Sequence, residues 1–130
     1  MRKILIIDDE ADIREVAALS LELVAGWQVR TAASGAQGLE AAKIEPPDAI
    51  LLDVMMPGMD GPSTFEALRN SKELREVPVV FLTAKVQAAE YRWLAAFGAS
   101  GILAKPFDPL TLAEDLSRTL GWSSPTSTQR

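Results

Sequence analysis

The sequence predicts an α/β protein in which a single five-stranded parallel sheet is flanked by five helices. Short apolar runs alternate along the chain with longer segments whose apolar residues recur at helical spacing. Each of the five runs is followed by such a segment, as a parallel sheet with helices on both faces requires. The length of 130 residues fits one domain of this kind.

The first strand is expected at residues 4–7, where an apolar run is halted by Asp8-Asp9-Glu10. Residues 11–25 should form the first helix, because their apolar residues recur at helical spacing and Gly26 is suited to end it. Apolar and polar residues alternate over 27–32, which predicts the second strand.

The start of the second helix is indicated by Ser34, with Gln37 at the capping-box spacing three residues later. This helix should end before Pro46. Residues 49–52 are a third apolar run, which ends at Asp53 and predicts a buried strand.

Pro62 can open the third helix, which is expected to run to about residue 70. β-Branched residues are frequent over 77–82 and predict the fourth strand. The fourth helix is expected over 84–97, with Gly98 ending it.

The last pair of elements is a weaker strand at 101–104 and a helix that Asp108 is predicted to cap, with Pro109 at its first position. Residues 1–121 are then expected to form the domain. We expect residues 122–130 to be a polar, disordered tail, with no output domain after it.

Cysteine and histidine are both absent from the chain. Disulfides and thiolate metal sites are therefore excluded, and so are a Ser-His-Asp triad, a histidine base and an ordinary zinc site. The formal net charge of -5 disfavours direct nucleic-acid binding. Because no apolar run is long enough for a signal peptide or a membrane span, we expect a cytoplasmic protein that does not engage a membrane.

Polar residues follow the expected strands at the points where those strands end. They are Asp8 and Asp9 after the first strand, Asp53 after the third, Thr83 after the fourth and Lys105 after the fifth. In an open parallel sheet these positions share the carboxyl edge, where ligands bind. Singly, each has an ordinary explanation, as a helix cap, a strand-end residue or a surface lysine. Their combination predicts a common site.

Acidic side chains gathered at one site repel one another. Two unit charges about 4 Å apart interact by roughly 4 kcal/mol at an effective dielectric constant of about 20. The arrangement therefore calls for a cation, and carboxylate oxygens without sulfur or imidazole suit Mg²⁺. Lys105 offers a positive charge for phosphate oxygens, and Thr83 offers a hydroxyl donor. A carboxylate nucleophile beside a divalent ion and a lysine is suited to phosphoryl transfer.

Four stretches of the chain, taken together in their order and spacing, form a specific motif set: KILIIDDE, ILLDVMMPGMDG, VVFLTA and GASGILAKPF. Through them the chain resembles the receiver domain of bacterial two-component response regulators over nearly its whole length, and is similar to the single-domain chemotaxis-type members. The resemblance implies a flavodoxin-like, doubly wound fold with strand order 2-1-3-4-5.

The resemblance also assigns the metal site and the phosphoacceptor. Asp53 matches the phosphoacceptor, which also contacts the ion, and Asp9 matches a direct Mg²⁺ ligand. Asp8 is implied to help mainly through water, and the backbone carbonyl of Met55 is implied to be a further ligand.

The remaining positions match groups that contact the phosphoryl group. Thr83 matches a switch hydroxyl that moves toward it, and the Ala84 backbone amide also faces it. Lys105 matches the phosphate-binding lysine, whose bond to Pro106 is implied to be cis.

The implied phosphoryl donor is a phosphohistidine on a sensor histidine kinase or a histidine phosphotransfer protein. Phosphorylation would bias a two-state equilibrium, and an unknown downstream protein would bind the face formed by the fourth helix, fifth strand and fifth helix. The chain would catalyse its own phosphorylation and slow dephosphorylation, with no separate turnover, and is in this sense not expected to be an enzyme.

Three positions depart from the common pattern or bear on its rates. Ile102 stands where the family usually has an aromatic residue that couples to the threonine. Neither Met55 nor Lys85 is suited to position an attacking water, so we predict slow self-dephosphorylation.

On the fourth helix, we expect Tyr91 to pack against the sheet, whereas Trp93 is a candidate for partial exposure.

Three alternatives stay open. The missing aromatic residue leaves room for a degenerate receiver that acts as a phosphorylation-independent binding adaptor. A magnesium-dependent phosphatase would usually have an Asp-x-Asp pair after the first strand, whereas Asp8 and Asp9 are adjacent. A flavodoxin-like electron carrier would need a Ser/Thr/Gly phosphate cradle that the loop after the first strand lacks.

Overall fold

Five parallel strands form one sheet in the order β2-β1-β3-β4-β5 in the computed structural model, which describes residues 1–84 and 87–125. The strands are β1 (Lys3–Ile7), β2 (Gln28–Ala32), β3 (Ala49–Asp53), β4 (Val79–Thr83) and β5 (Gly101–Ala104). The predicted fold class and the strand order implied by the resemblance are both confirmed.

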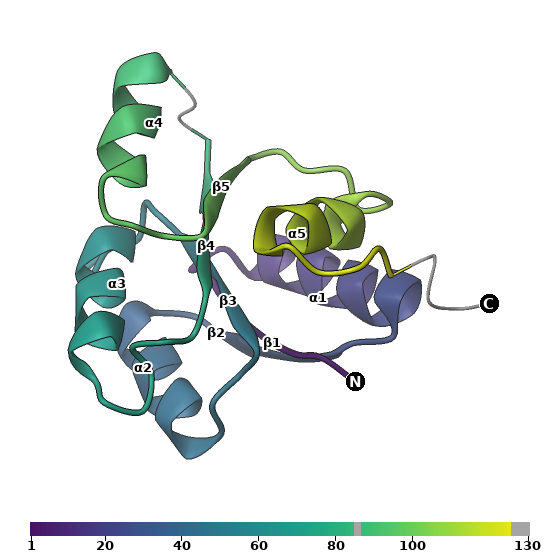
Figure 1. The fold of residues 1–130 in the computed structure, drawn as a ribbon, viewed down its shortest axis with the longest axis horizontal. Helices are drawn as coiled ribbons and strands as arrows, with labels where there is room; N and C mark the ends of the chain where they lie inside the picture. The colour runs from purple at the N-terminus through teal and green to yellow at the C-terminus, as the bar shows by residue number, and fades with distance from the viewer. Residues whose placement is uncertain (85–86, 126–130) are drawn as a thin grey trace.

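Five helices cover the two faces of this sheet. They are α1 (Ala11–Ala25), α2 (Gly35–Ile44), α3 (Gly61–Asn70), α4 (Ala88–Ala95) and α5 (Leu112–Leu120). Figure 1 shows the sheet nearly edge-on, with α1 and α5 on one side and α2, α3 and α4 on the other. Crossover helices on both faces are what allow the neighbouring strands to run parallel.

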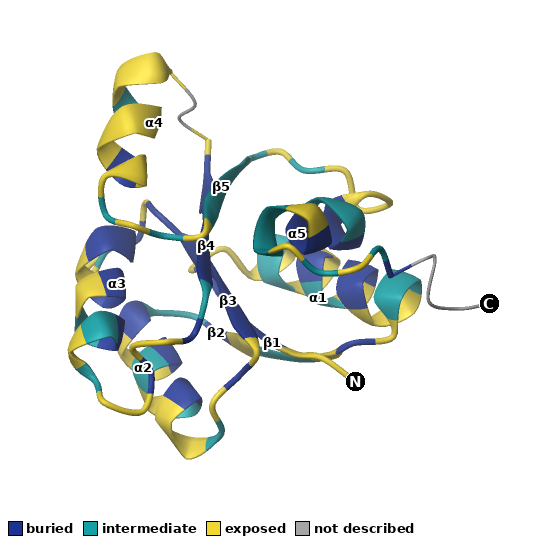
Figure 2. Ribbon diagram, viewed as in Figure 1, coloured by how far each residue is buried: buried dark blue, intermediate teal, exposed yellow. Residues whose placement is uncertain are grey.

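The apolar core consists of two layers, one on each face of the sheet. Alternate residues of the central strands point to opposite faces, so Leu5 and Ile7 pack toward α2 and α3 while Ile4 and Ile6 pack toward α1 and α5. Every residue of β3 and β4 is buried, and Figure 2 shows these strands between covered faces. The carboxyl ends of β3 and β4 are therefore held rigidly.

Local signals placed two helix starts correctly. The Ser34 hydroxyl accepts a hydrogen bond from the Gln37 amide at the start of α2. Asp60 caps α3 in the same way, by accepting a bond from the Ser63 amide, and Pro62 lies in the first turn. The strand expected at 77–82 instead begins at Val79, because Pro78 has no N–H to donate to the ladder.

The predicted start of the last helix is wrong. α5 begins at Leu112, with Thr111 as its N-cap residue, rather than directly after Asp108. The Asp108 carboxylate accepts a hydrogen bond from the Leu110 amide and so stabilises a turn that precedes the helix. α4 is also shorter than the expected 84–97: it begins only at Ala88, and at its C-terminal end the Phe97 amide donates to the Leu94 carbonyl and the Gly98 amide to the Ala95 carbonyl, which tightens the last turn.

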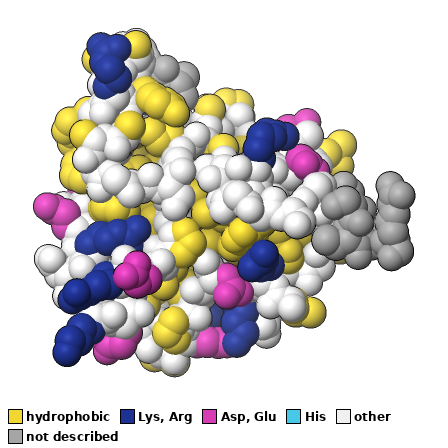
Figure 3. Space-filling model, viewed as in Figure 1, with side chains coloured by type: hydrophobic (Ala, Val, Ile, Leu, Met, Phe, Trp, Pro, Cys, Tyr) yellow, Lys and Arg dark blue, Asp and Glu magenta, His cyan; other side chains and the backbone are white. Residues whose placement is uncertain are grey.

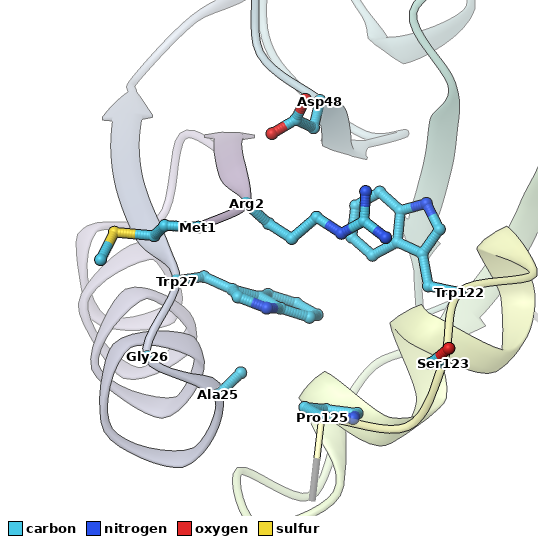
Figure 4. Close-up of a pocket in the computed structure, with 9 residues that line it drawn as sticks. All are labelled: Met1, Arg2, Ala25, Gly26, Trp27, Asp48, Trp122, Ser123 and Pro125. Carbon is cyan, nitrogen blue, oxygen red and sulfur yellow. The ribbon is translucent and has the colours of Figure 1, made fainter. Parts of the chain in front are cut away.

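The amino edge of the sheet carries a cleft of about 510 Å³ (Figure 4). Trp122 folds back here and meets Trp27 edge-on, with 5.5 Å between the ring centroids, and the Arg2 guanidinium lies 4.0 Å from the Trp122 ring centroid. Of the tail expected from residue 122, residues 126–130 lie outside the described part of the chain.

The outer surface carries charges of both signs. In the view of Figure 3, Lys and Arg side chains are interspersed with Asp and Glu side chains. Among the described residues, none of the helices is both long enough and apolar enough to cross a membrane.

Candidate functional site at the carboxyl edge of the sheet

Four of the residues predicted from the strand ends meet at the carboxyl edge of the sheet. Asp8 directly follows β1, Asp53 and Thr83 end β3 and β4, and Lys105 follows β5. Backbone bonds extend the ladders into this edge: the Asp8 amide donates to Ala32 and the Lys105 amide to Thr83. Asp8, Asp53 and Thr83 are buried, with at most 3% of each exposed.

The Lys105 ammonium lies at the centre of the group. Its Nζ is 2.9 Å from Asp8 Oδ2, 2.9 Å from Glu10 Oε1 and 3.3 Å from Asp53 Oδ1. The Lys105 side chain is only 11% exposed, and its peptide bond to Pro106 is cis, as the resemblance implied. One cation therefore faces three carboxylates.

This excess of negative charge fits a divalent cation. Carboxylate oxygens of Asp8, Glu10 and Asp53 all lie within 4.8 Å of one another. Asp53 Oδ2 is buried and has no hydrogen-bond partner among the residues that the structure describes. A buried carboxylate oxygen without a partner is costly, and hard oxygen donors are what Mg²⁺ binds, so the donor set fits this ion.

The environment changes the proton affinity of both central groups. Burial raises the pKa of Asp53 to about 6; the nearby Asp8 carboxylate acts in the same direction, and the Lys105 ammonium opposes both. Burial alone would lower the pKa of Lys105, but hydrogen bonds to Asp8 and Glu10 and the charge of Asp53 hold it above its usual value. Lys105 is thus a permanent cation beside a carboxylate that is sensitive to its charged neighbours.

The other predicted site residues lie at the rim. Asp9 is exposed, and its carboxylate is not among the three whose oxygens lie within 4.8 Å of one another. Ala84 is also exposed, and the Met55 side chain is 60% exposed. Lys85 lies outside the described residues.

Glu10 is the site residue that the sequence reasoning missed. It was assigned only to the polar run that ends β1, yet its carboxylate contacts Lys105 across 95 positions of the chain. The available signal was the third acid in the run Asp8-Asp9-Glu10. The spacing alone does not show which of three consecutive acids turns toward the site.

A small apolar cleft of about 180 Å³ adjoins this site. It is lined by Val54, Met55, Thr83, Glu90, Trp93 and Leu94. Trp93 is 55% exposed, which agrees with the expected partial exposure. Tyr91 was expected to pack against the sheet, and this expectation is wrong because 49% of the residue is exposed. Leu94 is the residue through which α4 is anchored in the core.

Comparisons with known proteins agree on one family. Residues 4–117 match the response regulator receiver domain. Protein PilH of Pseudomonas aeruginosa is 34% identical over 120 residues, which cover 92% of this chain and 98% of PilH. The crystal structure of the chemotaxis protein CheY4 of Vibrio cholerae has a TM-score of 0.85 and 37% identity, covering 92% of this chain and 99% of that one.

Longer relatives match over a part of their length. The probable transcriptional regulator ycf27 of Cyanophora paradoxa is 36% identical over 111 residues, which cover 85% of this chain and 45% of that protein. The chain thus spans less than half the length of this regulator.

Proposed function

The chain belongs to the response regulator receiver domain family of two-component signal transduction, and we propose that it is a switch in which Asp53 accepts a phosphoryl group from a partner protein. The observation that carries this proposal is the convergence of Asp8, Asp53 and Lys105 from three strand ends at contact distance. Phosphoryl transfer depends chiefly on such positioning and charge neutralisation.

The donor we propose is a phosphohistidine on a sensor histidine kinase or a histidine phosphotransfer protein, since this chain has no histidine of its own. An Asp53 carboxylate oxygen forms a bond to phosphorus as the N–P bond of the donor breaks. The electron pair of that bond leaves with the imidazole nitrogen. Lys105, Thr83 and the Ala84 amide are proposed to bind the transferred oxygens.

Mg²⁺ is the proposed cofactor, and it would neutralise charge on the phosphoryl oxygens and on the acids. Asp53 and Asp8 would hold it, together with Asp9 and the Met55 carbonyl, as the resemblance implies. The partnerless Asp53 Oδ2 supports this assignment.

The output is proposed to pass through the face formed by α4, β5 and α5 to a downstream protein. The chain is not expected to turn over a separate substrate. Its location in the cytoplasm and the lack of direct nucleic-acid or membrane binding stay predictions. A pull-down with beryllofluoride-treated protein, compared with Asp53→Asn, tests the output, and a partner retained equally by both would contradict it.

Acetyl phosphate provides the direct test of phosphorylation. Incubation with acetyl phosphate and Mg²⁺ should label the protein with one phosphoryl group, which intact-mass spectrometry detects as added mass. This label should be lost at alkaline pH, because acyl phosphates hydrolyse there. Asp53→Asn and wild type with EDTA are the controls, and neither should be labelled. Equal labelling of Asp53→Asn would contradict the proposal, and a complete lack of labelling would favour the adaptor alternative.

A further inference from the structure

Glu10 differs from the other two carboxylates that contact Lys105. All three lie within 3.3 Å of the ammonium, but the Glu10 side chain is 61% exposed, whereas those of Asp8 and Asp53 are 0% and 3% exposed. Asp8 and Asp53 are fixed by the ends of β1 and β3. Glu10 is therefore the one partner of Lys105 that can turn into water without leaving a buried charge behind.

The Glu10 carboxylate has no other structural task in the described chain. Glu10 is the N-cap residue of α1, yet its side chain accepts no capping hydrogen bond. Its backbone amide donates to Asp8 Oδ1, which fixes the turn and leaves the carboxylate directed at Lys105. The contact with Lys105 is thus separable from the start of the helix.

We propose that Glu10 is a positioning residue that holds the Lys105 ammonium in the unphosphorylated protein and gives it up when a phosphoryl group occupies Asp53. This inference rests on the proposed function. Phosphorylation turns the Asp53 carboxylate into an acyl phosphate, whose carbonyl oxygen carries no charge, and it brings anionic oxygens beside an ammonium whose three N–H donors already face Asp8, Glu10 and Asp53. To contact the phosphoryl oxygens, the ammonium must give up contacts that it makes in the unphosphorylated protein. The contact with the exposed Glu10 costs the least free energy to break, because the Glu10 carboxylate can be solvated by water. The Glu10–Lys105 ion pair therefore stabilises the unmodified state.

The Glu10→Gln variant tests this competition. It keeps the length of the side chain but removes its charge, so Lys105 should be more available to a phosphoryl mimic. At saturating Mg²⁺, beryllofluoride should bind Glu10→Gln roughly two- to fivefold more tightly than wild type, the range expected for a partly exposed ion pair. Tryptophan fluorescence can follow the titration, because Trp93 lines the cleft beside Thr83.

Glu15→Gln is the matched control. Glu15 is an exposed acid on the same helix, and no hydrogen bond or ion pair of its side chain is found among the described residues. The Glu15→Gln substitution changes the net charge by the same amount as Glu10→Gln and should leave the affinity for beryllofluoride as in wild type. An unchanged or weaker affinity in Glu10→Gln would overturn the inference, and a weaker one would point to Glu10 as a ligand of the ion instead.

A second measurement needs neither phosphate nor metal. Urea unfolding in EDTA of wild type, Glu10→Gln, Lys105→Met and the double variant should give a favourable coupling between the two positions, and its absence would overturn the inference. Should Lys105→Met fail to fold, nitrogen NMR of the Lys105 ammonium replaces it. The ammonium should lose protection from exchange in Glu10→Gln but not in Glu15→Gln, and equal protection would overturn the inference.

The two proposals fail in different ways. A wild-type protein that binds no beryllofluoride would overturn the proposed function and this inference with it. A wild-type protein that binds beryllofluoride as tightly as Glu10→Gln would overturn the inference alone.

Discussion

Burial and charge raise the pKa of Asp53, and this makes the stability of the metal-free protein depend on pH. The pKa of Asp53 in the folded protein, about 6, lies above its ordinary value of 3.8. Between about pH 4 and pH 6 the folded state thus binds more protons than the unfolded state, and stability falls as the pH rises.

The Asp53→Asn variant should therefore be more stable than wild type in EDTA above about pH 7, by about 3 kcal/mol, since the pKa is raised from 3.8 to about 6 and one pKa unit corresponds to roughly 1.4 kcal/mol. The difference should shrink below about pH 4, where the wild-type carboxyl group is protonated in both states. Urea unfolding across this pH range measures it. A wild-type advantage at neutral pH would show that Asp53 is not a destabilising buried charge.

Met55 bears on the lifetime of the proposed acyl phosphate. Its exposed thioether side chain lies on the cleft beside Thr83 and offers no strong hydrogen bond to an attacking water. The phosphorylated wild-type protein should therefore persist for minutes or longer in Mg²⁺. Met55→Asn should shorten this lifetime several-fold, because an amide can position water. Loss of acetyl-phosphate-derived label after removal of the donor measures it, and a wild-type lifetime of seconds would contradict the prediction.

The central site residues were predictable because each lies at the end of a strand. Asp53, Thr83 and Lys105 follow apolar runs, and parallel strands bring such positions to one edge whatever the details of the loops. The roles of Asp9 and Glu10 were less accessible, since they depend on how the turn after β1 directs consecutive acids. Tyr91 was misjudged because α4 contacts the core through little more than Leu94, which leaves most of the helix surface in solvent.

Elements with strong local signals were predicted closely, and those fixed by tertiary packing were not. The apolar runs of β1 and β3 and the Ser34 cap of α2 needed no distant information. The start of α5 is set differently: the Ser20 hydroxyl of α1 donates to the Pro109 carbonyl and ties the preceding turn to α1. A cap assigned from neighbouring residues alone cannot include that contact.

The packing of α3 against the end of β3 depends on a glycine. A Cβ at Gly61 would lie 2.5 Å from the Asp53 carbonyl oxygen and 2.7 Å from Val54 Cα, both of which are backbone atoms that cannot turn aside. Gly61→Ala should therefore destabilise the protein by about 1–3 kcal/mol and reduce labelling of Asp53 by acetyl phosphate.

Gly101→Ala is the matched comparison at another helix–strand contact. There the added Cβ would meet the Thr119 side-chain methyl group, which can move aside only if the Thr119 hydroxyl gives up its hydrogen bond to the Asp115 carbonyl. Stability should therefore fall in this variant as well, but labelling should be unaffected because Gly101 is not packed against Asp53. Thermal or urea unfolding and the labelling assay measure both variants. Equal losses of labelling would show that Gly61 does not act through the backbone at Asp53.

In the molecule as a whole, the two edges of the sheet have separate tasks. The carboxyl edge gathers three acidic side chains around one ammonium, whereas at the amino edge Arg2, Trp27 and Trp122 form aromatic and cation–π contacts. Stability and chemistry should therefore respond to different substitutions.

Trp122 is the residue that tests this separation. It packs edge-on against Trp27, lies under the Arg2 guanidinium, and its amide donates to the Ser117 carbonyl at the end of α5. Trp122→Ala should lower the free energy of unfolding by about 2 kcal/mol, less than for a fully buried tryptophan. Labelling by acetyl phosphate should be unchanged at temperatures where the variant is folded. The free energy of unfolding of Tyr91→Ala, at an exposed aromatic residue, should stay within about 0.5 kcal/mol of that of wild type.

A chain ending at residue 121 should lose as much stability as Trp122→Ala, because it lacks the same aromatic contact. A truncated chain as stable as wild type would contradict this expectation and would place the domain boundary where the sequence predicted it.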